Sequence, residues 1–113
     1  MFYMPKYQNL PDGRLVFLRF PDPARHALPV SQLLQGIPAG EAAAAFLAEV
    51  NAHPLRLVLV AEIGNDVAGC GLLELNDPVQ RQVAVQAQYR GLGLEGLMET
   101  ALAEVAAQKG VEL

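Results

Sequence analysis

One stretch of the sequence decides how the fold is interpreted, residues 83–113, which read VAVQAQYRGLGLEGLMETALAEVAAQKGVEL. Before the first glycine the chain alternates: residues 79, 81, 83, 85 and 87 share one face and residues 80, 82, 84 and 86 the other, as on a β-strand. After the glycines, apolar residues recur at helical spacing and form one stripe: Leu94, Leu97, Met98, Ala101, Leu102 and Val105. Lys109 in the last turn and Gly110 as the cap predict where this helix ends, and residues 111–113 begin another strand.

The turn between strand and helix, residues 88–96, has the properties of an anion site. Glycines at a helix N-terminus leave backbone N–H groups without partners, and the helix dipole adds about half a positive charge at that end. Arg90 is the only formal cation nearby. A ligand that carries a di- or triphosphate is therefore the preferred interpretation. The alternative, that the glycines only make a tight connection and cap a helix, stays open.

Two phosphate-binding patterns compete for these glycines. Gly91, Gly93 and Gly96 satisfy G-x-G-x-x-G, the dinucleotide fingerprint, which requires an apolar parallel strand within a βαβ unit. The residues before Gly91 are mostly polar, the strands upstream read as hairpins, and the acidic ribose ligand could only be Glu112 at the chain end. The context of a dinucleotide site is therefore missing.

The second pattern fits the surrounding residues. Residues 88–93, QYRGLG, satisfy Q/R-x-x-G-x-G/A and follow the strand residues VAV at 83–85. By residue identity and by order of elements, residues 83–110 resemble the acetyl-CoA-binding motif of the GNAT superfamily of N-acetyltransferases. The order of elements predicted over residues 15–113 is similar to that of the first part of the GNAT fold.

The resemblance implies a cofactor site. In the family, the strand before the glycines splays away from the next strand, and its exposed backbone pairs with the pantetheine arm of acetyl-CoA. The pyrophosphate lies on the loop amides, and the first residue of the motif orients the loop. The residues that the resemblance places at this site are Val83, Val85, Gln88, Arg90, Gly91, Leu92, Gly93 and Glu95.

Glu95 departs from the small residue that many family members have at this position. A carboxylate beside a bound phosphate is repelled unless it points to solvent. The helix dipole favours the same carboxylate by about 0.3–1 kcal/mol.

The resemblance also implies a reaction, direct transfer of an acetyl group to an amine. A base removes the ammonium proton, the amine attacks the thioester, and an acid protonates the leaving thiolate. A tyrosine beyond the motif commonly serves as the acid in the family, and this sequence has none after Tyr89. We nominate Glu74 as the catalytic base, with Glu62 as the other strand carboxylate, although a solvated hairpin position is the alternative for both. His26 and His53 each stand alone beside prolines, so neither predicts a metal site or a triad.

The remaining sequence predicts one α+β domain over residues 1–113, with αβα layers and a mostly antiparallel sheet. A strand is expected over residues 15–20, stopped by Pro21 and Pro23, with helices over residues 29–34 and 41–50. Residues 56–63 and 67–75 predict a β-hairpin around a turn at 64–66. Because the GNAT fold continues beyond its fifth strand, we expect a C-terminally truncated GNAT-like domain whose open strand edge favours association.

Composition restricts the partners. Eight basic and twelve acidic residues give a net charge of -4, which lacks the basic footprint of nucleic-acid binding. No stretch is long enough for a membrane span or a signal peptide. The single cysteine, Cys70, lies among apolar residues and predicts a small buried side chain in a protein of the reducing cytoplasm. Two interpretations stay open for the aromatic residues Phe2, Tyr3 and Tyr7. The first expects them to line an acceptor pocket, and the second expects a disordered or partner-bound N-terminus.

Three functions follow, in decreasing order of support. The first is an N-acetyltransferase that uses acetyl-CoA, without a metal, on an amine of a small molecule or peptide. The second is a non-catalytic acyl-CoA-binding or subunit-interaction module, and the third is a dinucleotide-binding domain. A truncated chain, a subunit completed by another chain and a CoA-binding remnant all remain open. Each of them predicts self-association as a homo-oligomer.

Overall fold

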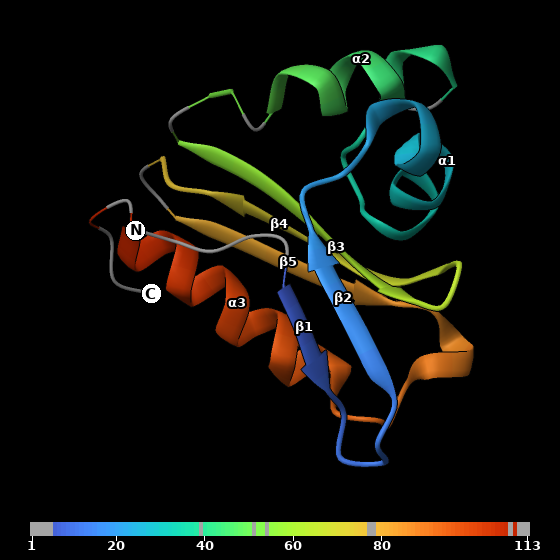
Figure 1. Cartoon of the computed structure of the whole chain (residues 1–113). Coiled ribbons are helices and arrows are strands. Elements are labelled where there is room, and N and C mark those ends of the chain that lie inside the picture. Colours follow the sequence, from blue (N-terminus) through green and yellow to red (C-terminus); the bar gives the residue numbers. More distant parts are fainter. Residues whose placement is uncertain are drawn as a thin grey trace.

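The computed structural model describes residues 6–38, 40–50, 52–53, 55–76, 79–108 and 110. Within them, five antiparallel strands form one sheet in the order β1-β2-β3-β4-β5. Helix α3 covers one face of the sheet, and α1 and α2 cover the other (Figure 1). The elements are β1 (Lys6–Asn9), β2 (Leu15–Arg19), α1 (Pro23–Leu33), α2 (Glu41–Val50), β3 (Arg56–Ile63), β4 (Asp66–Glu74), β5 (Gln80–Val85), the short 3₁₀ helix η1 (Ala87–Tyr89) and α3 (Leu94–Gln108).

The centre of the sheet is the hairpin of β3 and β4, which confirms the hairpin predicted from the sequence. Both strands are almost continuously apolar because helices cover both of their faces. The register shifts between Ala61 and Glu62 of β3, which pair with Gly69 and Val67, so Ala68 of β4 is the extra residue of a β-bulge. The α+β class with a mostly antiparallel sheet and flanking helices is confirmed.

The two faces of the sheet bury separate apolar cores. On one face, Leu18, Leu59 and Leu73 pack with Met98 and Leu102 of α3. On the other face, strand residues pack under α1 and α2, among them Val58, Val60, Cys70 and Leu72. Buried aliphatic side chains of this size each contribute about 1.5–3 kcal/mol, so both layers stabilise the sheet that carries β5.

Two glycines of β4 face helix α3 and leave no room for a side chain between them and the helix. A Cβ atom added at Gly69 would stand 3.2 Å from Sδ of Met98, and one added at Gly71 would stand 3.0 Å from Cδ1 of Leu102. Side chains at these two positions would push the helix away from the sheet. The glycines therefore set how deep α3 sits.

The structure corrects the start of the chain in two places. The sequence left Tyr7 as a pocket residue or as part of a disordered or partner-bound N-terminus. Residues Lys6–Asn9 form an ordered edge strand paired with β2, so disorder is wrong for Tyr7, and its pocket and partner roles stay predictions. The helix expected from Pro29 begins at Pro23, because the side chain of Asp22 caps it by accepting from the amides of Ala24 and Arg25. Pro29 lies inside this helix.

The end of the chain agrees with the sequence where it is described. The predicted strand over 79–87 is shorter, Gln80–Val85, and η1 occupies its last positions. The predicted helix runs from Leu94 to Gln108, and Gly110 has the positive φ of a C-terminal cap, 83°. Residues 1–5, Lys109 and residues 111–113, for which a pocket role, a last-turn position and a strand were expected, lie outside the described residues.

Candidate functional site

The site predicted from the sequence lies where β5 passes through η1 into α3. The backbone turns sharply here because Gly91 and Gly93 adopt positive φ angles, 79° and 88°. Such angles cost a residue with a side chain about 1–2 kcal/mol, so the sequence places glycine at both. The turn delivers the chain directly to the first residue of a 15-residue helix.

The backbone N–H groups of this turn are not used internally. Within the described residues, the amides from Gly91 to Gly96 donate to no acceptor, and the first amide that does so is that of Leu97, 3.2 Å from the carbonyl oxygen of Gly93. Gly91 and Gly96 have open space on the side where a Cβ would stand. Six consecutive unsatisfied donors at a helix N-terminus make a local positive potential that suits an anion.

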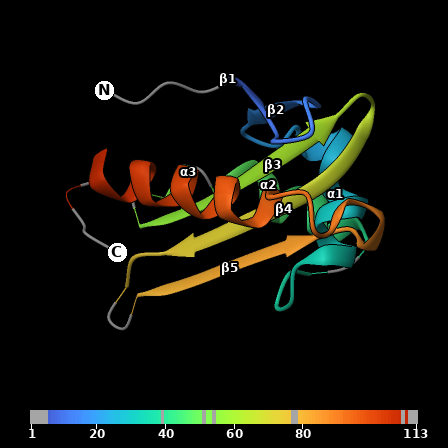
Figure 2. The same cartoon turned by 90° about the horizontal axis from the view of Figure 1, so that it is seen from below.

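The strand that leads to the turn presents an open edge. The amide of Gln86 donates to the carbonyl of Ala68 at 2.8 Å, continuing the register in which Val85 faces Gly69. Because outward and inward backbone groups alternate in an antiparallel pair, Val83 and Val85 direct their N–H and C=O groups away from β4. In the described part of the chain β5 is the last strand of the sheet, as Figure 2 shows.

Three side-chain hydrogen bonds fix the base of the turn. The side-chain Nε2 of Gln86 donates to the carbonyl of Val67 at 2.8 Å, and Nε2 of Gln88 donates to Oε1 of Gln86 at 3.2 Å. The hydroxyl of Tyr89 donates to Oδ2 of Asp66 at 2.8 Å. This hydrogen bond, together with burial, raises the pKa of Tyr89. For Gln88, expected to orient the loop, the structure gives one side-chain partner, Gln86.

The two charged residues of the turn both reach solvent. Nε of Arg90 lies 3.4 Å from the carbonyl oxygen of Val85, so the guanidinium group lies beside the open edge of β5. Glu95 is exposed, which keeps its carboxylate free to point away from the turn. Leu92 is half-buried against the α3-side core and anchors the middle of the turn.

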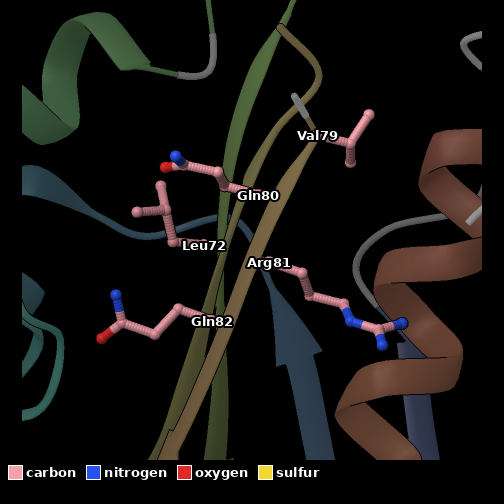
Figure 3. Close-up of a pocket in the computed structure, with 5 residues that line it drawn as sticks. All are labelled: Leu72, Val79, Gln80, Arg81 and Gln82. Carbon is pink, nitrogen blue, oxygen red and sulfur yellow. The ribbon is translucent and has the colours of Figure 1, made fainter. Parts of the chain in front are cut away.

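A cavity of about 420 Å³ opens at the other end of β5. Its lining residues are Leu72, Val79, Gln80, Arg81 and Gln82 (Figure 3). Gln80 and Gln82 point to the side of α1 and α2, and Arg81 points to the side of α3, as the alternation predicted. The side chain of Gln82 accepts from the amide of Gln35 at 2.7 Å and donates to its carbonyl at 3.3 Å, which ties the end of α1 over the strand.

Glu74, nominated as a base, lies at this cavity end of the sheet. It pairs in register with Gln80, and its Oε1 lies 3.6 Å from Nη2 of Arg56. Its side chain is 27% exposed, so it is open to solvent and to a ligand. The structure thus places Glu74 at one end of β5 and the glycine turn at the other.

Glu62 belongs to a buried charge cluster that the sequence did not predict. Its carboxylate is 4% exposed and lies 2.7 Å from Nη2 of Arg25, 3.6 Å from Nη1 of Arg19 and 3.4 Å from Nε2 of His26. Nδ1 of His26 accepts from the amide of Asp22 at 2.8 Å, so in neutral His26 the proton is on Nε2. Burial lowers the pKa of His26, and the neighbouring Glu62 carboxylate offsets part of that effect. The signal available in the sequence was a glutamate inside an otherwise apolar strand.

Other candidate groups do not add chemistry. Cys70 is fully buried, and burial raises the pKa of its thiol to about 12, which makes it a core residue as predicted. The described residues contain no group of three or more His, Cys, Asp or Glu side chains that could hold a metal ion. In the same residues, no helix combines the length and the apolar character that crossing a membrane requires.

Comparison with known proteins gives the fold. No protein-family model matches the sequence, and no curated protein matches it. Among solved structures, a GNAT-family acetyltransferase from Streptococcus pneumoniae is 16% identical with a TM-score of 0.69, and the match covers 86% of this chain and 70% of that one. The yncA protein of Salmonella typhimurium, an acetyltransferase by name and solved with its cofactor acetyl-CoA, is 20% identical with a TM-score of 0.60 over 85% of this chain and 65% of that one.

A third structure, a cAMP-binding acyltransferase from Mycobacterium smegmatis, is 21% identical with a TM-score of 0.64, and this chain covers 36% of its length while 95% of this chain is matched. The chain therefore spans about a third of that enzyme and about two thirds of the other two. The arrangement of five antiparallel strands, two helices on one face and α3 after the glycine turn is that of the GNAT acetyltransferase fold.

Proposed function

We propose that this chain binds acetyl-CoA along β5 and the glycine turn, and that it supplies the cofactor-binding part of an N-acetyltransferase. The observation that carries the proposal is the run of six unused amides from Gly91 to Gly96 beside the open edge of β5. The pyrophosphate accepts from these amides, and Arg90 adds a positive charge. The backbone groups of Val83 and Val85 pair with the amides of the pantetheine arm.

This orientation gives the acetyl group a direction. An extended arm that starts at the turn and follows the edge of β5 leads toward Gln80, about 17 Å from Val85 at the usual rise of a strand. The cavity lined by Gln80 and Gln82 opens at that end. The acceptor amine meets the thioester there, and the acidic composition of the chain suits a cationic acceptor.

In this reaction Glu74 is the base. It removes a proton from the ammonium group, the neutral amine attacks the thioester carbonyl, a C–N bond forms and the C–S bond breaks. As the C–S bond breaks, the nitrogen loses its second proton and the leaving thiolate takes up a proton, which gives CoA and the neutral N-acetyl product. The support for Glu74 is its place in register with Gln80 at the cavity end of β5 and its partial exposure.

Titration calorimetry with the full chain tests the cofactor. We expect CoA and acetyl-CoA to bind and NADH to give no heat, because the strands before the turn are antiparallel. Binding of NADH with no binding of CoA would refute the proposal. Release of free thiol from acetyl-CoA with a panel of amines then tests catalysis. Glu74→Gln should reduce that release at least about tenfold without changing CoA affinity. The matched control is Glu49→Gln, at an exposed position of α2.

One observation favours a second candidate, an acyl-CoA-binding module without catalysis. The last tyrosine of the sequence, Tyr89, is 9% exposed and its hydroxyl is bonded to Asp66, so it is not free to protonate a thiolate. If the chain binds CoA and releases no thiol with any amine, this second function holds.

A further inference from the structure

The turn between β1 and β2 is held by its own hydrogen bonds, which the sequence did not predict. The amide of Gly13 donates to the carbonyl of Leu10 at 2.9 Å, and the amide of Leu10 donates to the carbonyl of Arg14 at 2.8 Å. Asp12 accepts from the amide of Arg14 at 3.0 Å and pairs with its side chain at 3.1 Å. Pro11 occupies the second position of this turn, where its ring fixes φ. Leu10 is 3% exposed and anchors the turn in the core.

This turn presents Pro11 to the glycine turn before α3. A Cβ added at Gly93 would lie 3.3 Å from Cδ and 3.5 Å from Cγ of Pro11, so the proline ring covers that side of Gly93. Gly91 and Gly96 have no neighbour within 4 Å on the corresponding side. The β1–β2 turn and the start of α3 lie together at the lower edge of Figure 1.

The backbone of the glycine turn depends on contacts with other parts of the chain, because its own amides donate no hydrogen bonds within the described residues. None of the amides from Gly91 to Gly96 is bonded within the described residues, and the segment is tied to the helix through the carbonyl of Gly93, which accepts from the amide of Leu97 at 3.2 Å. What else restricts this segment is the burial of Leu94, the partial burial of Leu92 and the Pro11 ring, which occupies the space beside the Cα of Gly93 where a side chain would stand. A site made of backbone amides binds tightly only when they are already in place, since ordering them on binding costs affinity.

We infer that Pro11 is a positioning residue for the pyrophosphate-binding turn: its ring holds Gly93 so that the following amides stay aligned for a diphosphate. The inference rests on the proposed binding of CoA. It assigns the β1–β2 turn, from the start of the chain, to the cofactor site. Pro11 lies beside the turn at Gly93, so its effect should be confined to ligands that carry the diphosphate.

The test compares CoA with pantetheine, which lacks the diphosphate, on Pro11→Gly of the full chain. We expect the dissociation constant of CoA to rise about tenfold, because the turn must now be ordered on binding. The dissociation constant of pantetheine, measured from amide shifts in NMR titrations, should stay within about twofold, because β5 is untouched. Lys6→Ala is the matched control: it removes a 2.9 Å contact from the same hairpin to Glu104 of α3, and both ligands should bind as before.

Each outcome decides between explanations. Unchanged CoA affinity in a folded Pro11→Gly variant overturns the inference, and so does an equal loss for CoA and pantetheine, since the turn would then act only on overall stability. If the glycine variant does not fold, Pro11→Ala is measured in its place, with the same expected direction and the same grounds for rejection. A wild-type chain that binds no CoA refutes the proposed function itself, before any variant is measured.

Discussion

Two polar regions lie at the same end of the sheet and use their groups in opposite ways. Two guanidinium groups and an imidazole lie within 3.6 Å of the Glu62 carboxylate, which is itself 4% exposed. In the turn from Gly91 to Gly96 there is no comparable set of side chains, and the backbone donors face open space. The first region satisfies its charges internally, and the second leaves its donors for a ligand.

The difference separates stability from binding. A buried carboxylate with cationic partners is costly to break, because the groups left behind lose their compensation. Unused amides on the surface cost little in water and gain a partner when an anion arrives. Changes at Glu62 should therefore act on folding, and changes in the glycine turn should act on CoA. The experiments below test that separation, from the largest effect to the smallest.

Gly93→Val should have the largest effect, because it acts on the turn and on its support together. Valine at a φ of 88° is strained, and its side chain meets Pro11, so we expect a loss of about 2 to 4 kcal/mol in the free energy of unfolding. CoA affinity should fall at least about 100-fold. Calorimetry and urea denaturation measure the two quantities. Gly110→Val is the matched control, with a φ of 83° at the other end of α3: it should lose stability and keep CoA affinity.

Glu62→Gln should destabilise the fold and leave the affinity for CoA nearly unchanged. Removing the charge leaves Arg25 and Arg19 facing a neutral amide, which should cost about 3 kcal/mol in urea denaturation. We expect CoA affinity to change less than about twofold. Glu104→Gln, which breaks an exposed pair with Lys6, should cost under about 0.5 kcal/mol. A large loss of CoA affinity in folded Glu62→Gln would show that the cluster belongs to the binding site.

The pH dependence of stability should reveal His26. Because burial lowers its pKa in the folded state, the unfolded chain binds the extra proton first, and stability falls as the pH drops below the ordinary histidine value of 6.5. The slope for one proton is at most about 1.4 kcal/mol per pH unit. Denaturation at several pH values between 7 and 5 measures it. His26→Asn, which keeps an acceptor for the amide of Asp22, should flatten the curve, and an unchanged slope would assign it to other groups.

Gly96→Ala should stabilise the chain slightly. This residue lies in the first turn of α3 with open space around its Cα, and replacing a helical glycine with alanine gains about 0.5–1 kcal/mol. Its amide remains available, so CoA should bind within about threefold of wild type. A loss as large as that of Gly93→Val would show that phosphate passes directly over this glycine.

Arg90→Ala should give the smallest effect, and one that depends on salt. The side chain is exposed beside the carbonyl of Val85, so its charge is screened by ions. We expect CoA affinity to fall about threefold at low ionic strength and to change little near 1 M salt. Arg56→Ala, which removes an equal charge beside Glu74, should leave CoA affinity unchanged at both. Equal losses at both salt concentrations for Arg90→Ala would indicate a packing role.

The sequence predicted the second half of the chain better than the first, for a physical reason. Residues 56–63 alternate little and carry β-branched side chains, and the helix after the glycines has a regular stripe, so local pattern alone defines both. The four residues of β1 carry no such pattern, and they are a strand only because β2 lies beside them. The start of α1 depends on the side chain of Asp22, which the two prolines around it obscured.

The site divides in the same way. The glycines and their helix were recognisable because residue type fixes backbone geometry at those positions. The contacts that hold the turn were not, since Pro11 meets Gly93 and Tyr89 meets Asp66 only in the folded chain. The same holds for the neighbours of Glu62, which come from β2 and α1.

The two glycines of β4 give the molecule an adjustment point away from any ligand. Gly69 and Gly71 let α3 pack directly on β4. A methyl group at either position would crowd the side chains of α3 and push the helix away from the sheet. The N-terminus of α3 would move with it, and the glycine turn would be carried outward from the edge of β5. In the proposed site, CoA affinity should therefore depend on two core residues that do not line it.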